Sequence, residues 1–251
     1  MNKLESIFTN NKVLIPFITC GDPNRDVTKA AVKAMVEGGA DIIELGIPFS
    51  DPTAESPVVQ ASYDRALKVG TYADEIFELV SDLRKEITVP FVLVTYANPV
   101  FSYGTENFIR KAASCGIDGI IIPDVPFEEK SEFADICKEV GISLISVLAP
   151  TSTNRISMIA KDAEGFLYIS ADAGEGESST VVSDVRAQGV TLPCVTSASI
   201  STAEQAKTAA VYSDGVVLPS GVVEILEKYG TEAPSHIATY IKEIKSALQA
   251  D

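Results

Sequence analysis

Two carboxylates stand out in the first quarter of the chain as candidates for acid/base chemistry. Glu44 lies near the end of a short apolar run, Asp41–Leu45, and Glu55 follows a loop that is rich in turn-forming residues. Burying a carboxylate among apolar side chains is costly, so an acid within such a run indicates a use for it. A second acid near by is typical of general acid/base catalysis on a bound ligand. The pair therefore predicts a site at the end of this run.

The elements that must position these acids are short apolar runs that alternate with amphipathic segments. Nearly continuous apolar strands are buried on both faces, as in a parallel sheet. Between them, apolar residues recur at helical spacing, for example over residues 76–83 and 133–140. Eight runs are expected to form strands: Val13–Thr19, Asp41–Leu45, Pro90–Thr95, Gly119–Ile122, Ser143–Leu148, Phe166–Ser170, Cys194–Thr196 and Gly215–Leu218.

Eight such strand–helix units in 251 residues predict one α/β domain, a single (β/α)8 TIM barrel over residues 1–251. Ligands of such barrels bind at the carboxyl ends of the strands. Strand alternation places Ile42 and Glu44 on one face, and Ile43 and Leu45 on the other. Gly116 and Gly141 are expected to end helices.

The composition of the chain argues against two classes of binding partner. The net charge of −15, from 20 basic and 35 acidic residues, disfavours nucleic acid and anionic membranes. No apolar run reaches the roughly 18 residues of a membrane span, and the first residues lack the apolar core of a signal peptide. We therefore expect a cytoplasmic protein without a membrane partner.

Cysteine and histidine usage predicts no metal site. The four cysteines form no CxxC pair, and the sole histidine, His236, is remote from them, so buried structural thiols are expected. An acidic loop leaves two alternatives open, a solvated surface or oxygen ligation of a hard cation. Its acids are Asp172, Glu175 and Glu177.

Four segments carry a resemblance to a known family. Residues 16–23 (PFITCGDP), 44–52 (ELGIPFSDP), 95–99 (TYANP) and 122–126 (IPDVP) resemble the tryptophan synthase alpha subunit in order and spacing. The resemblance implies a lyase that cleaves indole-3-glycerol phosphate to indole and glyceraldehyde 3-phosphate. It implies no cofactor, and it implies a tryptophan synthase beta subunit as a partner.

The resemblance also assigns roles to residues. Glu44 matches the glutamate that moves protons at the indole C3 and the glycerol hydroxyl. Glu55 stands where the family has an aspartate that binds the indole N–H, although a solvated loop charge is the alternative for this residue. The expected substrate-binding residues are Phe17, Tyr96, Tyr168, Gly174, Ser199 and Ser220.

The later loops depart from the family pattern at the phosphate end. The family has glycines in these loops, which let backbone N–H groups approach a phosphate. In this chain Ser197, Ser199 and Pro219 stand in their place, and proline has no backbone N–H to donate. Glu177 adds negative charge, so turnover is expected to be impaired. The alternative function is a remodelled barrel, diverged or engineered, or a non-catalytic one. Such a barrel would bind a beta subunit or a non-phosphorylated, indole-like ligand.

Other acids have plainer interpretations. Asp22 and Asp124, near strand ends, are expected to be turn or cap residues. Asp51 either caps its loop or faces a partner.

Overall fold

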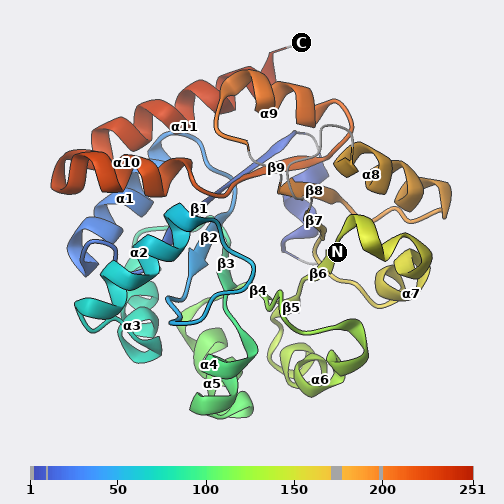
Figure 1. Cartoon of the computed structure of the whole chain (residues 1–251), viewed down its shortest axis with the longest axis horizontal. Coiled ribbons are helices and arrows are strands. Elements are labelled where there is room, and N and C mark those ends of the chain that lie inside the picture. Colours follow the sequence, from blue (N-terminus) through green and yellow to red (C-terminus); the bar gives the residue numbers. More distant parts are fainter. Residues whose placement is uncertain (1–2, 10, 171–176, 198–199, 251) are drawn as a thin grey trace.

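The structure is a computed structural model that describes residues 3–9, 11–170, 177–197 and 200–250. Parallel strands form a barrel at its centre, and helices surround them (Figure 1). Neighbouring strands follow the order β5-β4-β3-β2-β1-β9-β8-β7-β6. The strands are β1 (Val13–Thr19), β2 (Ile43–Gly46), β3 (Phe91–Val94), β4 (Gly119–Ile121), β5 (Ser143–Leu144), β6 (Ser146–Leu148), β7 (Leu167–Ser170), β8 (Cys194–Ser197) and β9 (Gly215–Leu218).

The expected strand Ser143–Leu148 is broken at Ile145. Its first piece, β5, pairs with β4, whereas its second piece, β6, pairs with β7. The backbone N–H of Ile145 still donates to the Ile120 carbonyl at 2.9 Å. Because β5 and β6 follow each other along the chain, the break is also where the barrel closes. The predicted TIM barrel is therefore confirmed, with its fifth strand in two parts.

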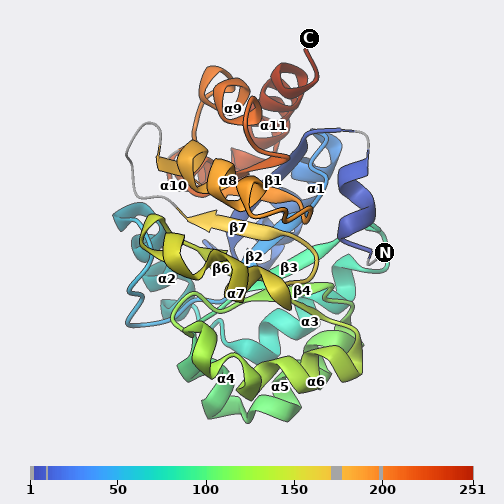
Figure 2. The same cartoon turned by 90° about the vertical axis from the view of Figure 1, so that its right-hand side faces the viewer.

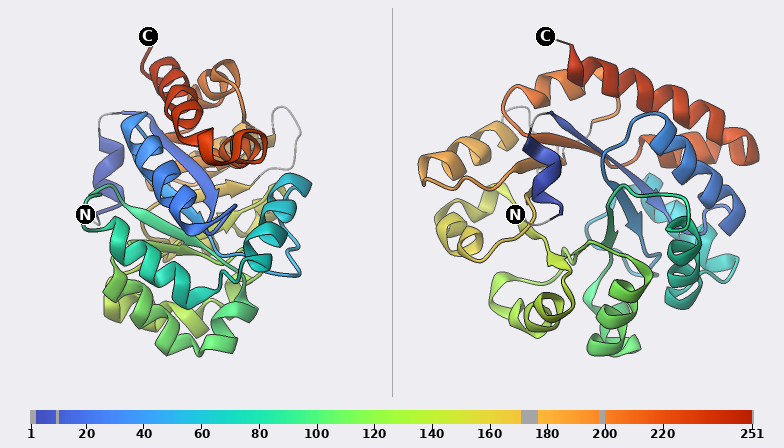
Figure 3. Two further views of the ribbon diagram at one scale, coloured as in Figure 1. Left: turned by 90° about the vertical axis from the view of Figure 1, so that its left-hand side faces the viewer. Right: turned by 180° about the vertical axis from the view of Figure 1, so that it is seen from behind.

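The helices cover the outside of the barrel, and α9 and α11 lie on the side opposite α4, α5 and α6 (Figures 2 and 3). The α-helices are α1 (Arg25–Glu37), α2 (Pro57–Lys68), α3 (Ala73–Leu83), α4 (Ala97–Tyr103), α5 (Thr105–Cys115), α6 (Ser131–Val140), α7 (Ile156–Lys161), α8 (Glu177–Ala187), α9 (Ala203–Ala210), α10 (Gly221–Tyr229) and α11 (Ala233–Gln249). Short 3-10 helices are η1 (Glu5–Thr9), η2 (Phe127–Glu129), η3 (Pro150–Arg155) and η4 (Gly230–Glu232).

Helix ends follow local chemistry. The Asn24 side chain accepts from the Val27 N–H at 3.0 Å and caps α1, which satisfies an amide that the helix itself leaves free. Gly116 and Gly141 end α5 and α6 with φ of 94° and 78°, a left-handed conformation that favours glycine. Both glycine stops predicted from the sequence are confirmed.

Two apolar layers sandwich the strands. Ile42 packs inside the barrel, in a buried cluster with Phe17 and Val92, whereas Ile43 and Leu45 pack outward against the helices. The predicted alternation along β2 is confirmed, and it directs Glu44 inward with Ile42.

The cysteines are free and buried, as expected: Cys20, Cys115, Cys137 and Cys194. Burial raises the pKa of the Cys20 thiol to about 12, so it stays protonated. In the part of the chain that the structure describes, no helix is long and apolar enough to cross a membrane.

Candidate active site

Glu44 lies in β2, paired with Phe17 of β1 and Val92 of β3, and its side chain faces the barrel interior. It is 1% exposed, and its Oε1 has no hydrogen-bond partner among the described residues. Burial, and secondarily the charge of Glu55, raises the pKa of the Glu44 carboxyl to about 8. A buried acid without a structural partner is available to a ligand.

Glu55 enters the same region on the loop between β2 and α2. Tyr96 holds this loop, because its hydroxyl accepts the Ala54 N–H at 3.0 Å. On the other side of Glu55, Gln60 donates to the Glu55 carbonyl at 2.8 Å. Burial raises the pKa of the Glu55 carboxyl to about 7, which the nearby Tyr63 hydroxyl partly opposes. Glu55 is thus a half-buried neighbour of Glu44 rather than a solvated loop charge.

Tyr63 is a site residue that we did not predict from the sequence. It lies on α2, is fully buried, and packs in the interior cluster with Val59. Its hydroxyl is close enough to Glu55 to affect both pKa values, yet it meets the geometry of a hydrogen bond with no described residue. The available signal was the spacing of Val59 and Tyr63, one turn apart on the buried face of α2.

A pocket of about 340 Å³ opens beside these acids at the carboxyl ends of the strands. Tyr168 and Ser197 both line this pocket, and the Tyr168 hydroxyl donates a hydrogen bond to Ser197 Oγ at 2.7 Å. Burial, followed by the charge of Glu44, raises the pKa of Tyr168 well above its usual range, so this hydroxyl stays protonated. The lining residues are Ala54, Glu55, Ser56, Val59, Val94, Ile121, Pro123, Val147, Tyr168, Ser170, Ser197, Ser201, Pro219, Ser220 and Glu224.

Most of the predicted binding residues converge here. Tyr168 and Ser220 line the pocket, and Phe17 and Tyr96 belong to the same interior cluster as its apolar wall. Gly174 and Ser199 lie outside the described residues.

The far end of the pocket is acidic. Ser220 immediately precedes α10, and its hydroxyl hydrogen-bonds to Oε1 of Glu224 at 2.9 Å. Glu224 is a lining residue that we did not predict, because it reaches the pocket from α10, one turn after Ser220. Glu177, the first residue of α8, is exposed. Asp172 and Glu175, which we considered with it as cation ligands, lie outside the described residues.

The other two acids near strand ends have structural roles, of which only that of Asp124 is the cap predicted from the sequence. Asp22 is 1% exposed and accepts two hydrogen bonds of 2.8 Å from Arg65. Asp124 accepts the Ala97 N–H at 3.0 Å, at the start of α4. Asp51 is exposed on its loop, which leaves its two interpretations undecided.

The geometry supports proton transfer to and from an apolar ligand. Two carboxyls with pKa values of about 8 and about 7 both exchange protons near neutral pH. Glu44, the more deeply buried of the two, is the better candidate for the acid that holds a proton.

Comparison with known proteins agrees with this arrangement. A family model described as tryptophan synthase alpha chain matches residues 5–250. The tryptophan synthase alpha chain of Lacticaseibacillus casei is 40% identical, over 100% of this chain and 97% of that protein. The crystal structure of the alpha subunit from Legionella pneumophila superposes with a TM-score of 0.92 at 31% identity, over 99% of each chain. A chain of the a2b2 complex from Pyrococcus furiosus gives a TM-score of 0.87 at 32% identity, over 93% of this chain and 98% of that one. The chain therefore belongs to the tryptophan synthase alpha chain family.

Proposed function

We propose that this protein cleaves indole-3-glycerol phosphate to indole and glyceraldehyde 3-phosphate by a retro-aldol reaction. Family membership supports this lyase activity. The observation that carries it is the buried Glu44 carboxyl, whose Oε1 has no partner among the described residues and whose pKa is raised to about 8 beside a second carboxyl. Such a group holds a proton at neutral pH and gives it up readily.

Glu44 acts first as an acid and then as a base. It donates its proton to the indole C3, which turns the ring into an electron sink. The resulting carboxylate removes the proton of the glycerol hydroxyl next to the scissile bond. That oxygen becomes the aldehyde carbonyl, the carbon–carbon bond breaks, and its electron pair returns to the indole ring. Glu44 ends protonated, as it began.

In its ionised form Glu55 accepts the indole N–H, which becomes more acidic when C3 is protonated. Fixed negative charge next to a developing positive charge lowers the barrier most where water is excluded. Tyr96 supports this role because it holds the backbone at Ala54, next to Glu55.

The phosphate end is the weak part of the site. Ser220 Oγ and the first amides of α10 are the donors available there. Glu224 competes for the Ser220 hydroxyl and repels an anion, and Pro219 offers no N–H. We therefore expect a raised KM for the phosphorylated substrate with the acid/base chemistry intact.

A tryptophan synthase beta subunit is the proposed partner. Solved relatives include chains of the tryptophan synthase of M. tuberculosis and of the P. furiosus a2b2 complex. We place the docking surface on the loop around Asp51, which lies exposed beside the loop that carries Glu55.

The direct test measures indole released from indole-3-glycerol phosphate, with and without a beta subunit. Glu44→Gln should lower kcat at least about 100-fold, since it removes general acid/base catalysis. Glu37→Gln is the matched control, because Glu37 is exposed on α1 away from the site. An unchanged kcat in Glu44→Gln would contradict the mechanism.

A wild-type protein that releases no indole, yet activates a beta subunit, would favour the non-catalytic barrel. The weakness of the phosphate end has its own test. Replacing both residues, Pro219→Gly with Glu224→Gln, should lower KM for the phosphorylated substrate and leave kcat similar.

A further inference from the structure

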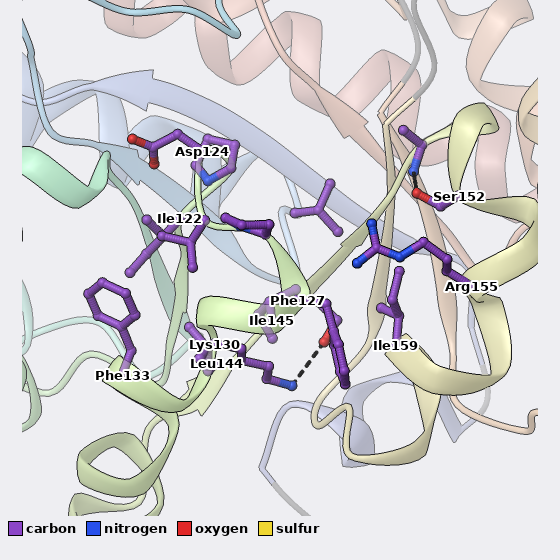
Figure 4. A pocket seen from close by; sticks show the side chains of 16 residues that line it. Ile122, Asp124, Phe127, Lys130, Phe133, Leu144, Ile145, Ser152, Arg155 and Ile159 are labelled. Carbon is purple, nitrogen blue, oxygen red and sulfur yellow. Dashed lines mark hydrogen bonds between the residues drawn. The ribbon is translucent and has the colours of Figure 1, made fainter.

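A second cavity, of about 490 Å³, lies where the fifth strand is broken. It is bounded by the end of β4 and the loop after it, by β5 and β6, and by η3 and α7 (Figure 4). We call it the β4–β6 pocket. Its lining residues are Ile122, Pro123, Asp124, Val125, Pro126, Phe127, Lys130, Phe133, Leu144, Ile145, Ser146, Val147, Ala149, Ser152, Arg155 and Ile159.

The β4–β6 pocket adjoins the candidate active site. Pro123 and Val147 line both cavities. After Ile145 the chain leaves β4 and pairs with β7, so the carboxyl end of β4 has no strand partner on that side. A molecule in the β4–β6 pocket would therefore contact side chains that also shape the wall of the active site.

Lys130 is a cation in this pocket that forms no salt bridge with a described carboxylate. Its ammonium donates to Ser146 Oγ at 3.1 Å and to the Asp162 carbonyl at 3.2 Å, and both acceptors are neutral. Among the described residues, no carboxylate oxygen lies within 4.0 Å of it. Burial lowers the pKa of Lys130, although Asp162 and Glu164 act in the opposite direction. A half-buried ammonium in this setting gains from a bound anion.

Arg155 is the second cation of the pocket. Figure 4 shows its side chain extending from η3 toward the middle of the cavity. One of its nitrogens donates to both carboxylate oxygens of Glu128, so its charge is balanced locally, while its other nitrogens remain available as hydrogen-bond donors. Asp124, the one acidic lining residue, already accepts the Ala97 N–H.

The rest of the wall is apolar. Figure 4 places Phe127 and Ile159 near the cations, and it places Ile122, Phe133 and Leu144 on the Lys130 side of the cavity. Apolar walls with a few convergent polar groups are typical of small-molecule sites. We infer that the β4–β6 pocket binds a small apolar carboxylate, whose anion meets Lys130 and Arg155 and whose body packs on Phe127 and Ile159.

A carboxylate fits better than a phosphate for two reasons. Lys130 bonds only neutral acceptors, whereas Arg155 is already paired with Glu128, so the pocket offers about one positive charge to a ligand. A phosphate would bring a second negative charge, which free backbone amides at the start of a long α-helix could bind. α6 begins at Ser131, behind Lys130, and its first residues do not line the pocket. The inference concerns binding and stands independently of the proposed lyase activity.

The test uses 2-naphthoate as the probe. The sequence contains no tryptophan, so naphthalene fluorescence can be followed with little protein background. We expect saturable binding to the whole protein, and at least about tenfold weaker binding of the neutral 2-naphthamide, since a charge-assisted hydrogen bond is lost. Inorganic phosphate at equal concentration should not displace the naphthoate.

Variants locate the site. Lys130→Gln should weaken 2-naphthoate binding about tenfold, and Arg155→Gln should weaken it about threefold. Lys161→Gln, an exposed lysine on α7, is the matched control and should bind as the wild type does. If Lys130→Gln folds poorly, the Arg155 variant on the exposed side still decides the question.

Three results would overturn the inference. They are equal binding of acid and amide, unchanged binding in both cation variants, or weakened binding in Tyr168→Phe, which would place the probe in the active site. A lower apparent affinity for indole-3-glycerol phosphate in the presence of 2-naphthoate, abolished by Lys130→Gln, would show in addition that the shared wall couples the two cavities.

Discussion

Replacing Glu44 by glutamine should make the protein more stable at neutral and alkaline pH. Burial raises the pKa of Glu44 from its ordinary value of 4.5 to about 8, so the folded protein holds this proton more tightly than the unfolded chain does. Stability from this group is complete below about pH 4.5 and is lost as the pH rises toward 8. Glutamine resembles the protonated acid in shape and carries no charge, so the variant escapes this loss.

The magnitude follows from the two pKa values. Each tenfold difference in proton affinity corresponds to about 1.4 kcal/mol, so the full difference between 4.5 and about 8 sets an upper bound of about 5 kcal/mol. At pH 7 the ionisation cost is about 3 kcal/mol, and at pH 4.5 it is close to zero.

Urea unfolding at pH 5, 7 and 8.5 measures this difference. The free energy of unfolding of Glu44→Gln should exceed that of the wild type by a gap that widens with pH. Glu37→Gln, which changes an exposed glutamate on α1, should show no such gap. A constant difference between Glu44→Gln and the wild type across the three pH values would mean that Glu44 is ionised in the folded protein. The interpretation of Glu44 as a proton donor would then fail.

Three further outcomes are expected. If the two site carboxyls act as proposed, kcat/KM should be highest between about pH 7 and 8 and fall on both sides, which a pH–rate profile checks. Gly46→Ala should destabilise the protein by about 2 kcal/mol in urea unfolding, because the new Cβ would lie 2.4 Å from the Phe17 ring; an unchanged midpoint would contradict this. Arg65→Leu should cost about 3 kcal/mol, since it leaves the buried Asp22 carboxylate unpaired. If Arg65→Leu and Arg65→Lys unfold at the same temperature, the ion pair between Arg65 and Asp22 contributes less than this to the stability.

The sequence carried much of the fold because its signals are local and repeated. Apolar runs that alternate with helical periodicity are enough to indicate a parallel barrel, and Gly116 and Gly141 end helices for a reason that needs no partner. The break at Ile145 was not predictable, since Ser143–Leu148 looks like one strand. Which neighbour each half pairs with depends on the closure of the whole sheet.

The candidate site likewise combines residues that the sequence predicted with contacts that only the structure shows. The sequence by itself indicated Glu44 and Glu55, because an acid in an apolar run is costly and the surrounding motif is specific. Only the tertiary structure could show that Tyr63 lies near Glu55, that Tyr96 holds the loop, and that Glu224 lines the pocket. These contacts join residues from different strands and helices, and their effect on proton affinity arises from burial. The sequence determines which residue types are present, whereas the burial of the site carboxyls and their distances to other side chains exist only once the barrel has closed.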